Sequence, residues 1–483
     1  MDAAPAAPRT AAIEVKSIDY VPLDERSGKP SSLFPLWFMS NANLTTHASG
    51  MVGVAMGADF VTSVLAVLLG VAVGTVFTAF HSAQGPQLGL PQMIQSRAQF
   101  GYRGVAVMCL VVIASIVGFN IFNQILFADV AVAVSGVDAP LLWYAIVTAL
   151  ALTLAIFGYH WIHRTQRWLT WLFLATFGLF SVLAIFLVPV SPSHFWSGDV
   201  NWPGFLVQFG AASAYALGWA PYVSDYSRYL SPQTSPAKAS FYTYSGVFVG
   251  ASWLMILGSY VASLFADLDP IAAVRRTADE IFPGFGFILL VTALPALVTV
   301  ITVNIYAAAL ELITTVDSLR GIRATRRLRI VACAVVAVCG FLGAAVSSGE
   351  FLANFGSFLV VLLYVLVPWT SVNLVDYYFV RRGRYAVAQI FEPHGLYGAW
   401  GWRGLLSYAA GIVAMVPFVV TVWYTGPVAK MLGGIDIALF AGLIVSGGVY
   451  LLLGRTLDLT AERELATAES ARTGIRSVAF GEH

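Results

Sequence analysis

The sequence predicts an all-α polytopic membrane protein of twelve transmembrane helices, in which a 5+5 inverted repeat is followed by two peripheral helices. Of the 483 residues, 58% are apolar (AVILMFWYC) and only 11% are charged. Soluble domains are about 25% charged, so a soluble globule of this size is excluded. Twelve apolar runs along the chain are long enough to cross a hydrocarbon layer of ~30 Å as helices.

The apolar runs are bounded by charged residues, Pro and Gly. The candidate spans lie near 33–55, 61–80, 104–135, 139–159, 168–190, 204–224, 243–266, 285–316, 330–347, 350–379, 404–425 and 435–454. They divide the chain into a first five-helix repeat (32–190), a second, inverted repeat (204–379) and two additional helices (404–454). The tail 1–31 is polar and has no apolar h-region, so we expect a disordered segment rather than a cleaved signal peptide. A second tail, 455–483, follows the last span.

Basic residues are distributed unequally between the two sides of the predicted membrane. An even number of spans places both termini on one side, and that side carries 23 of the 26 Lys and Arg residues. The other side holds only Arg275, Arg276 and Lys430. Because cytoplasmic loops carry the excess of Lys and Arg, both tails are predicted to be cytoplasmic, in a multi-pass protein of the cytoplasmic (inner or plasma) membrane.

Two pairs of unusual spans indicate the internal repeat. Spans three (104–135) and eight (285–316) are each about 32 residues, or ~48 Å of helix, and are five spans apart. An odd repeat length inverts the second copy. Spans one and six are also five apart, and both are interrupted by Gly, Pro and polar residues. Glycine is common wherever membrane helices touch, but helices broken at corresponding places in two inverted halves are typical of a transporter's midplane site.

Charge and cysteine content exclude several classes of function. A net charge of +1 provides no concentrated basic face for nucleic acid. The three cysteines all lie within apolar runs, which favours neither a disulfide framework nor a Cys-based metal site. We therefore expect no cofactor and no metal. The expected partners are a small-molecule substrate and the lipid bilayer, and we expect a monomer.

Polar and aromatic residues on the interrupted and long spans are the candidates for recognition. Phe119 and Asn123 lie one helical turn apart on span three, so they share a face. Asn304 and Glu311 follow the 3.6-residue period along span eight. The alternative for the amides is hydrogen bonding between helices, since an unpartnered amide in lipid is costly.

Spans one and six add further amides and rings. Tyr215 and Trp219 are one turn apart on span six with Gly218 between them, and Asn41 and Asn43 lie in the interrupted part of span one. Rings and neutral amides with few charges suit a flat, nitrogen-rich heterocycle, because stacking is worth ~1–3 kcal/mol per base and an Asn amide both donates and accepts in one plane. The alternative for the rings is contact with lipid or filling of the core.

Three pieces of the chain are the most specific. They are Leu36–Asn43 (LWFMSNAN) leading to Gly50 and Gly53, the loop with Ser96–Arg97 and Phe100–Gly101, and the strongest of them, Gly218–Leu230 (GWAPYVSDYSRYL). By these motifs, the chain from about Ser32 to Arg384 resembles the nucleobase:cation symporter-1 family, most closely its purine/cytosine permease branch. The resemblance implies a leucine-transporter-type fold of ten core helices plus two. It also implies a secondary transporter, not an enzyme, which imports nucleobases (cytosine and/or purines) by alternating access and couples their import to H⁺ or Na⁺.

In that family the ligand lies between an aromatic residue of span three and one of span six, with amides from spans one, three and eight. The resemblance therefore implies that Phe119 stacks on the substrate, and it leaves Tyr215 and Trp219 as alternatives for the second ring. The substrate-binding candidates are Asn41, Asn43, Phe119, Asn123, Tyr215, Gly218, Trp219 and Asn304.

The coupling ion depends on a departure from the family pattern. Sodium-coupled relatives of the family use hydroxyls on span eight to hold Na⁺. At the positions that match by this resemblance, the chain has Ala307 and Ala308. A hard cation needs several oxygen ligands, so we favour H⁺ over Na⁺. Glu311 is the leading proton carrier because an intramembrane carboxyl is a functional candidate; its alternative is an ion pair with Arg320 or Arg323. His47, in the interrupted part of span one, is a second candidate.

Three charged residues are predicted to form an inner gate or a fold anchor. Asp225 and Arg228 lie three residues apart near the cytoplasmic end of span six. They can pair with each other or with Arg97, which lies in the loop after span two.

Two other functions remain open on the sequence. The nearest is a transporter of the same fold for hydantoin, allantoin, uracil or a vitamin, which could be coupled to Na⁺. The more remote is an intramembrane enzyme using His160 and His163, although metal chemistry would need three or more converging ligands.

Overall fold

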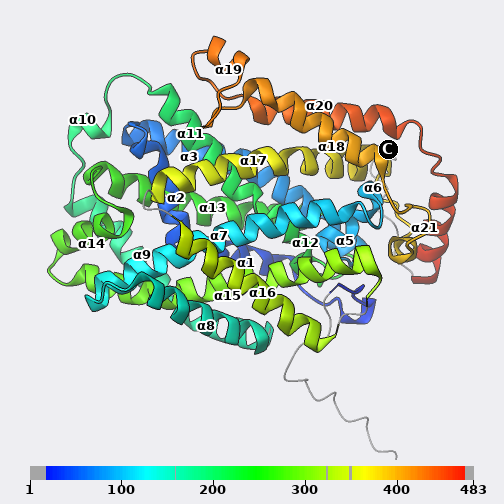
Figure 1. Ribbon diagram of the computed structural model, residues 1–483, viewed down its shortest axis with the longest axis horizontal. Coiled ribbons are helices and arrows are strands. Elements are labelled where there is room, and N and C mark those ends of the chain that lie inside the picture. Colours follow the sequence, from blue (N-terminus) through cyan, green and yellow to red (C-terminus); the bar gives the residue numbers. More distant parts are fainter. Residues whose placement is uncertain (1–17, 158, 323–324, 348–350, 422, 474–483) are drawn as a thin grey trace, which may run out of the picture.

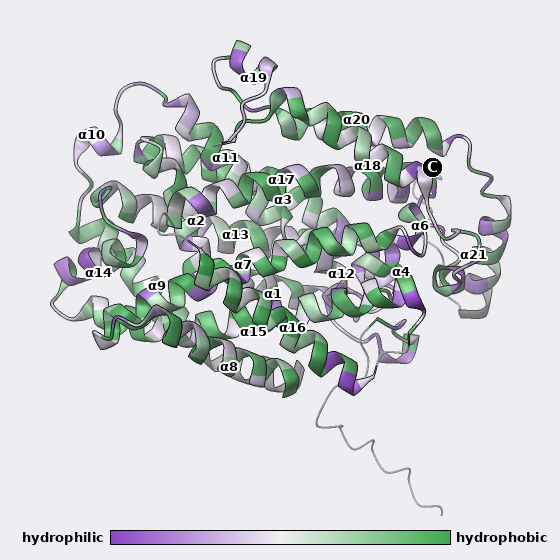
Figure 2. Ribbon diagram, in the orientation of Figure 1, coloured by the Kyte–Doolittle hydropathy of each residue, from purple (hydrophilic) through white to green (hydrophobic). Residues whose placement is uncertain are grey.

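The computed structural model describes residues 18–157, 159–322, 325–347, 351–421 and 423–473. Within these residues the regular elements are helices, and the β-structure is limited to two isolated bridges, Gly28 with Leu230 and Val420 with Thr425. Most of the long helices run side by side (Figure 1). Apolar residues fill the middle of this bundle and hydrophilic residues are concentrated near its two ends (Figure 2), as the bilayer requires of a spanning protein.

Seven helical segments of the described residues are long and apolar enough to cross a membrane. They contain α3 (Phe60–Ser82), α7 (Val105–Ser135), α8 (Pro140–Phe157), α13 (Pro236–Leu264), α15 (Phe285–Arg320), α16 (Arg326–Val346) and α17 (Phe351–Val375). Shorter apolar stretches occur in α9 (Tyr159–Leu187), in α20 (Ala438–Gly454), and in α18 (Trp402–Met415) with the η6 turn (Val416–Phe418) that follows it. The predicted all-α, multi-span class is confirmed.

The interruptions expected in spans one and six are present. Span one consists of α1 (Leu33–Ser40) and α2 (Leu44–Ala55). Span six consists of α11 (Trp202–Leu217), a short 3₁₀ turn η3 (Ala220–Tyr222) and α12 (Val223–Ser227). Asn43 caps α2 by accepting a hydrogen bond from the Thr46 amide, and Pro221 occupies the start of η3. A capping side chain and a proline are the local causes of the two breaks.

The helices adjoining the breaks form the centre of the bundle. α7 and α15, the two longest helices of the described residues, pack along each other. α11 packs against α3, while α1 and α2 pack against α13. α18 and α20 pack on each other and against α17, and Figure 1 shows them along one edge of the molecule.

Two glycines permit the close crossing of α2 and α13. A Cβ added at Gly50 would lie 1.9 Å from the carbonyl oxygen of Met255, and one added at Gly258 would lie 1.9 Å from the carbonyl oxygen of His47. Both distances are far inside van der Waals contact, so only glycine fits either position. This is the use of small residues at membrane helix interfaces.

Part of the N-terminal tail, which was expected to be disordered, is ordered, and the C-terminal tail contains a helix. Residues 18–31 of the predicted disordered tail pack on the body: the Val21 amide donates to the Gly89 carbonyl at 3.0 Å, and Arg26 is 4% exposed. The region 455–483 contains α21 (Thr460–Thr473), in which Glu462 is buried. Backbone pairing and a buried ion pair supply contacts that polar composition does not reveal. Residues 1–17 and 474–483 lie outside the described residues.

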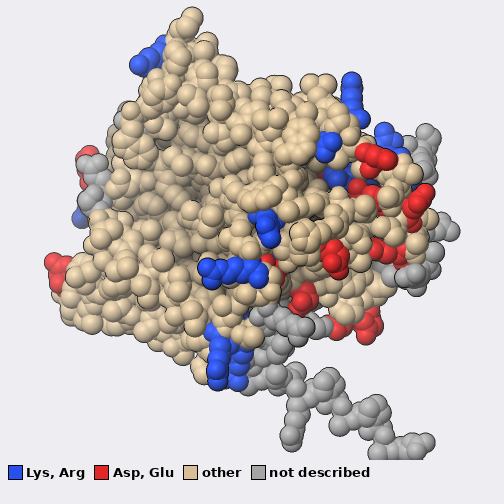
Figure 3. All heavy atoms as spheres, turned by 45° about the vertical axis from the view of Figure 1, so that its right-hand side comes forward, with Lys and Arg blue, Asp and Glu red and all other residues tan. Residues whose placement is uncertain are grey.

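Charged side chains gather at the end of the bundle that holds both of these segments. On the face shown in Figure 3, Lys, Arg, Asp and Glu lie mostly in the centre and the right-hand part, a few lie at the left edge and the top, and a broad area between is uncharged. Many large apolar side chains of the long helices are exposed, such as Leu69 on α3 and Phe186 on α9. An uncharged belt of this kind is the surface that a bilayer covers.

Candidate functional site

A small cavity lies where the two broken spans meet α7 and α15. It encloses about 20 Å³, room for about one water molecule. Its lining residues are Asn43, Thr45, Phe119, Asn123, Tyr215, Gly218, Trp219, Tyr222, Val300 and Asn304. The structure thus brings together every predicted substrate-binding residue except Asn41, and within the described residues the lining contains no charged side chain.

The rings of the cavity are set at steep angles to one another. Phe119 meets Tyr215 edge to face, with ring centroids 5.8 Å apart and an interplanar angle of 89°. Trp219 contacts Tyr222 with centroids 5.7 Å apart, at 75°. A flat ligand between two parallel rings needs a separation of about 7 Å, twice the optimal carbon contact. Phe119 and Tyr215 therefore cannot sandwich a ligand in this arrangement.

Asn41 and Asn43 serve the break in span one. The Asn43 side-chain oxygen accepts from the Thr46 amide at 3.0 Å, and its nitrogen donates to the Ser40 carbonyl at 2.9 Å. The Asn41 nitrogen donates to the Trp37 carbonyl at 2.7 Å. Its oxygen accepts from the Trp219 indole at 3.2 Å, so Asn41 lies behind the cavity and holds one of its rings.

The side-chain amides of Asn123 on α7 and Asn304 on α15 make fewer hydrogen bonds to the protein than those of Asn41 and Asn43. The Thr45 hydroxyl donates to the side-chain oxygen of Asn123, and both residues are buried. Within the described residues, no protein group accepts from the Asn123 nitrogen, and the Asn304 amide makes no hydrogen bond. Both side chains line the cavity. They are therefore the amides that can bind a ligand.

Sequence reasoning missed three lining residues: Thr45, Tyr222 and Val300. Val300 precedes Asn304 by one helical turn, and Tyr222 lies three residues after Trp219 within the Gly218–Leu230 string. Both spacings place neighbours on one face and could have been used. Thr45 had no such signal, because its role depends on contact with α7.

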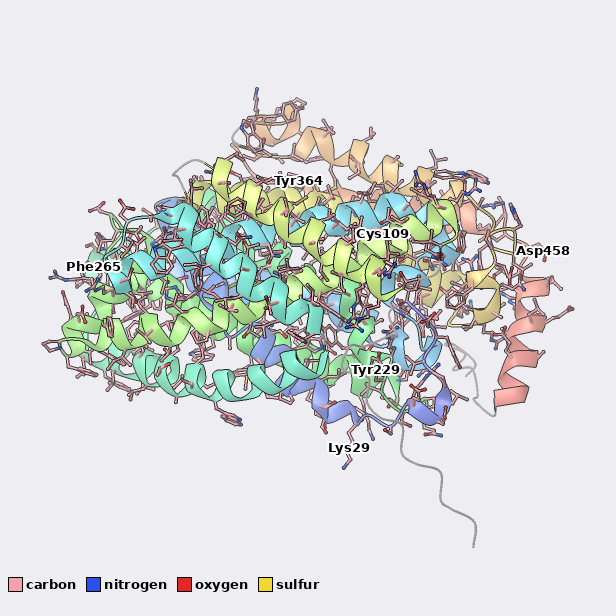
Figure 4. The ribbon with its side chains drawn as sticks, turned by 60° about the horizontal axis from the view of Figure 1, so that its bottom comes forward. Lys29, Cys109, Tyr229, Phe265, Tyr364 and Asp458 are labelled. Atoms are coloured by element: carbon pink, nitrogen blue, oxygen red, sulfur yellow. The ribbon has the colours of Figure 1, made fainter. Side chains whose placement is uncertain are left out.

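Glu311 lies two turns beyond Asn304 on α15, about 10 Å along the helix. Its side chain is buried, and one carboxyl oxygen has no hydrogen-bond partner among the described residues. The other interactions of this carboxyl are with the Cys109 thiol of α7 and, electrostatically, with Asp225. In Figure 4, Cys109 lies in the same half of the molecule as Tyr229 and Asp458, with Phe265 at the opposite end.

The alternative role for Glu311 was an ion pair with an arginine at the end of α15. No such pair forms with Arg320, which is exposed, and Arg323 lies outside the described residues. The second proton candidate, His47, is 1% exposed in α2 and is not part of the cavity lining. Its Nε2 atom has no hydrogen-bond partner among the described residues.

Of the two pairings expected among the charged residues near the inner ends of the spans, the one with Arg97 does not form. Arg97 of α6 (Arg97–Phe100) forms an ion pair with Asp317 of α15 at 2.8 Å, and not with Asp225. The Asp225 carboxylate instead accepts from the Gln92 amide at 3.0 Å. Arg228 donates to the backbone carbonyls of Asp225 and Asp19, at 3.2 and 3.1 Å. Asp225 interacts electrostatically with Arg228, as one of the two expected pairings has it. The alternative with Arg97 is wrong, because Arg97 meets Asp317, which is distant in sequence.

A larger hollow lies at the opposite ends of the helices. It encloses about 770 Å³ between the ends of α7, α8, α16 and α17 and the short helix α14 (Pro270–Ile281). Phe122 and Phe351 line it, and Phe122 packs 4.8 Å from Phe355, which in turn contacts Phe119 with centroids 6.4 Å apart. A cluster of phenylalanines thus separates this hollow from the small cavity.

The residues considered for an enzyme, His160 and His163, have side chains outside the described residues. In the part of the chain that the structure describes, no group of three or more His, Cys, Asp or Glu side chains could hold a metal ion.

Comparison with known proteins identifies the family. Residues 20–442 match the family described as permease for cytosine/purines, uracil, thiamine, allantoin. The chain belongs to the nucleobase:cation symporter-1 family, in its purine/cytosine permease branch. It is therefore a membrane transporter and not an enzyme.

Two curated members of the family align along most of this chain. The Bacillus subtilis protein YxlA, provisionally named a purine-cytosine permease, is 38% identical over 91% of this chain and 96% of its own. The purine-cytosine permease fcyB of Emericella nidulans is 26% identical over 91% of this chain and 88% of its own.

Solved structures of a family member share the fold. The inward-facing conformation of Mhp1 has a TM-score of 0.73 at 18% identity, covering 96% of this chain and all of Mhp1. A closed conformation of Mhp1 with bromovinylhydantoin bound has a TM-score of 0.71 at 18% identity, covering 97% and 98% of the two chains.

Proposed function

We propose that this protein imports nucleobases, cytosine and/or purines, in symport with protons. The observation that carries the substrate class is the lining of the small cavity: rings from α7 and span six, two available amides, Asn123 and Asn304, and no charged side chain among the described residues. An amino acid or a sugar phosphate would need fixed charge. A neutral, flat base needs stacking faces and a few amide hydrogen bonds, which this cavity supplies.

The cavity must expand to receive such a base. Small-molecule pockets enclose ~300 Å³ or more, against about 20 Å³ here. The large hollow at one end of the helices and the Arg97–Asp317 ion pair at the other support a cycle in which the two ends open in turn. We therefore propose alternating access around this cavity.

Helix packing supports an inverted repeat of five spans within a twelve-span chain. If spans one to five correspond to spans six to ten, then contact of span one with span seven requires contact of span six with span two. Both contacts occur, as α1 and α2 on α13 and as α11 on α3. By the same correspondence, contact of span four (α8) with span eight (α15) requires contact of span nine (α16) with span three (α7). Both of these contacts also occur. Repeats of 32–190 and 204–379, followed by the pair 404–454, fit this pattern.

Proton coupling is proposed from the residues on α15. Ala307 and Ala308 offer no hydroxyl where a sodium ion would need oxygen ligands. Glu311 is buried, is close enough to Asp225 to interact electrostatically, and retains a carboxyl oxygen without a partner among the described residues. A carboxyl in such a place can bind and release a proton as the inner end opens. His47 remains a second candidate for the proton carrier. No other cofactor is proposed.

The distribution of basic residues supports the orientation. The side with both termini carries 23 of the 26 Lys and Arg residues, which favours the cytoplasm for that side of the plasma or inner membrane. We propose that one chain is the transporting unit, because the small cavity lies inside the helical bundle, between α7, α15 and the two broken spans.

The decisive experiment is uptake into vesicles that contain the purified protein, driven by either a pH gradient or a Na⁺ gradient. Labelled cytosine or adenine should accumulate with the pH gradient and not with the Na⁺ gradient. Competition by cytosine, adenine, hypoxanthine, guanine, uracil, allantoin and hydantoin then ranks the substrates. Accumulation only of hydantoin, allantoin or a vitamin would replace the nucleobase assignment. A requirement for Na⁺ at constant pH would overturn proton coupling.

Two variants connect the uptake to the cavity. Asn304→Ala and Phe119→Ala should abolish accumulation of the base without changing the amount of protein in the vesicles. Phe186→Ala is the matched control, because Phe186 is 79% exposed on α9, away from the cavity. If both cavity variants transported normally, the site assignment would be wrong.

A further inference from the structure

The hydroxyl of Thr45 fixes the direction of the Asn123 amide. Thr45 lies on α2, two residues after the capping residue Asn43, and is 2% exposed. Its hydroxyl donates to the Asn123 side-chain oxygen on α7. An amide held by its oxygen has its nitrogen on the other side, and the Asn123 nitrogen has no acceptor within the described residues.

The remaining amides do not duplicate this arrangement. Both ends of the Asn43 side chain are used by the backbone at the break, through Thr46 and Ser40. The Asn304 amide forms no hydrogen bond among the described residues, so it can turn to present its oxygen, its nitrogen or both. Of the two lining amides that can bind a ligand, Asn123 has a fixed polarity and Asn304 adapts.

We propose that Thr45 is a positioning residue that makes the α7 side of the site a hydrogen-bond donor, so that the transported base must place an acceptor atom against Asn123. This inference rests on the proposed nucleobase function and specifies which feature of the base is selected. A base that presents C–H or N–H at that point leaves the amide N–H without a partner in a site closed to water. Such a loss weakens binding by about ten- to a hundred-fold.

Adenine is a suitable probe, because each of its hydrogen-bond acceptors is a ring nitrogen. Its 1-deaza, 3-deaza and 7-deaza analogues each replace one nitrogen by C–H and keep the shape of the base. Competition against uptake of labelled adenine gives the penalty for each nitrogen as the ratio of the two inhibition constants. Hypoxanthine and its deaza analogues replace this series if adenine does not compete.

Three variants separate positioning from general damage. Thr45→Val removes the hydroxyl and keeps the shape, so the Asn123 amide can rotate and the penalty for one nitrogen should fall at least about threefold. Thr45→Ser keeps the donor and should preserve the wild-type penalty. Thr75→Val is the matched control: Thr75 is a buried threonine of α3 whose hydroxyl has no partner among the described residues, and its removal should leave every penalty unchanged.

The ratio of the inhibition constants of two ligands of the same shape does not depend on the amount of folded protein. A variant with less folded protein has fewer binding sites for both ligands alike. If Thr45→Val does not fold, Thr45→Ala tests the same ratio. The proposal is wrong if no deaza analogue is penalised in the wild type, or if every penalty survives the loss of the hydroxyl. Absence of competition by any cytosine or purine ligand would instead refute the nucleobase function on which it rests.

Discussion

Arg97 of α6 donates to the carboxylate of Asp317 on α15 at 2.8 Å, across a gap of 220 residues in sequence. Arg97 is 1% exposed and also donates to Ser318 at 3.2 Å. The Tyr102 ring lies 4.1 Å from the guanidinium and its hydroxyl donates to the same carboxylate. The loop after span two is thus joined to the inner end of span eight by a nearly buried ion pair.

Breaking this ion pair should expose the inner part of α7. Removing one member of a buried pair leaves an unpaired charge, which costs ~3–5 kcal/mol and favours a conformation in which water reaches it. We expect Arg97→Ala to increase maleimide labelling of Cys109, which is buried beside Glu311, by about tenfold or more. Replacing Cys333 and Cys339 by alanine leaves Cys109 as the one thiol.

The matched control for this labelling is Arg276→Ala. Arg276 pairs with Glu280 at 3.0 Å on an exposed helix face, with side-chain exposures of 63% and 39%. Exposed pairs contribute little, so labelling should not change. Equal labelling of Cys109 in wild type and Arg97→Ala would show that the ion pair does not close the inner end.

Glu311→Gln should separate substrate binding from proton coupling. The glutamine keeps the size and hydrogen-bonding capacity of the carboxyl but cannot carry a proton. We expect accumulation driven by a pH gradient to fall to the level of passive exchange, while binding of the base changes by less than about threefold. Glu280→Gln, at an exposed position, is the control. Undiminished accumulation in Glu311→Gln would transfer the role to His47.

The second stacking ring can be tested by comparing Trp219 with Tyr215. Because Phe119 meets Tyr215 at 89°, we expect Trp219 to supply the second face. Trp219→Ala should then weaken binding of the base about ten- to a hundred-fold, since stacking is worth ~1–3 kcal/mol. Tyr215→Phe keeps the ring and loses the hydroxyl contacts with Thr46 and Asn43, so the change should be smaller. Calorimetric titration measures both, and the opposite order would assign the ring to Tyr215.

The crossing of α2 and α13 should not tolerate a methyl group. Gly258→Ala places a Cβ 1.9 Å from the His47 carbonyl oxygen, so the helices must separate, at a cost of about 1–3 kcal/mol as for other overpacked sites. The midpoint of thermal unfolding in detergent should fall. Gly210→Ala is the control, because a Cβ there meets nothing within 4 Å; a helical Gly→Ala change should leave the midpoint unchanged or raise it.

Acid should weaken the anchor of the loop before α3. Burial raises the pKa of Asp59, but hydrogen bonds from Ser197 and Thr62 outweigh burial and lower its pKa below the ordinary value. A lowered pKa stabilises the fold above the unfolded-state pKa of about 3.9, and this stability is lost as the pH falls through the folded-state pKa. The stability difference between wild type and Asp59→Asn should therefore be constant near neutral pH and disappear in acid. If the stability difference between wild type and Asp59→Asn persisted in acid, it would not come from the ionised Asp59 carboxylate.

The sequence predicted the parts of the site that depend on helical periodicity. Phe119 with Asn123, and Tyr215 with Trp219, are one turn apart, and a helix brings such pairs onto one face whatever surrounds it. The interruptions followed from Pro221 and from a cluster of polar residues at Asn43. These features are local, so a single sequence contains them.

Contacts between distant segments could not be predicted. Arg97 and Asp317 meet only because two helices cross, and the sequence offered Asp225 as a nearer partner. Asn43 lines the small cavity, but its amide atoms cap the break, which depends on side-chain torsions. The order in residues 18–31 comes from pairing with Gly89 and Leu230, for which polar composition gives no signal.

The small volume of the cavity has a consequence for every measured affinity. If the resting site encloses about 20 Å³, a base binds only the fraction of molecules in which the site has expanded, and the apparent dissociation constant is the intrinsic one divided by that fraction. A change remote from the cavity, such as Arg97→Ala, should multiply the affinities of all bases by one common factor. A change at Thr45 should alter their ranking. Comparing ligands in pairs therefore distinguishes a change in the fraction of molecules with an expanded site from a change in the contacts that recognise the base.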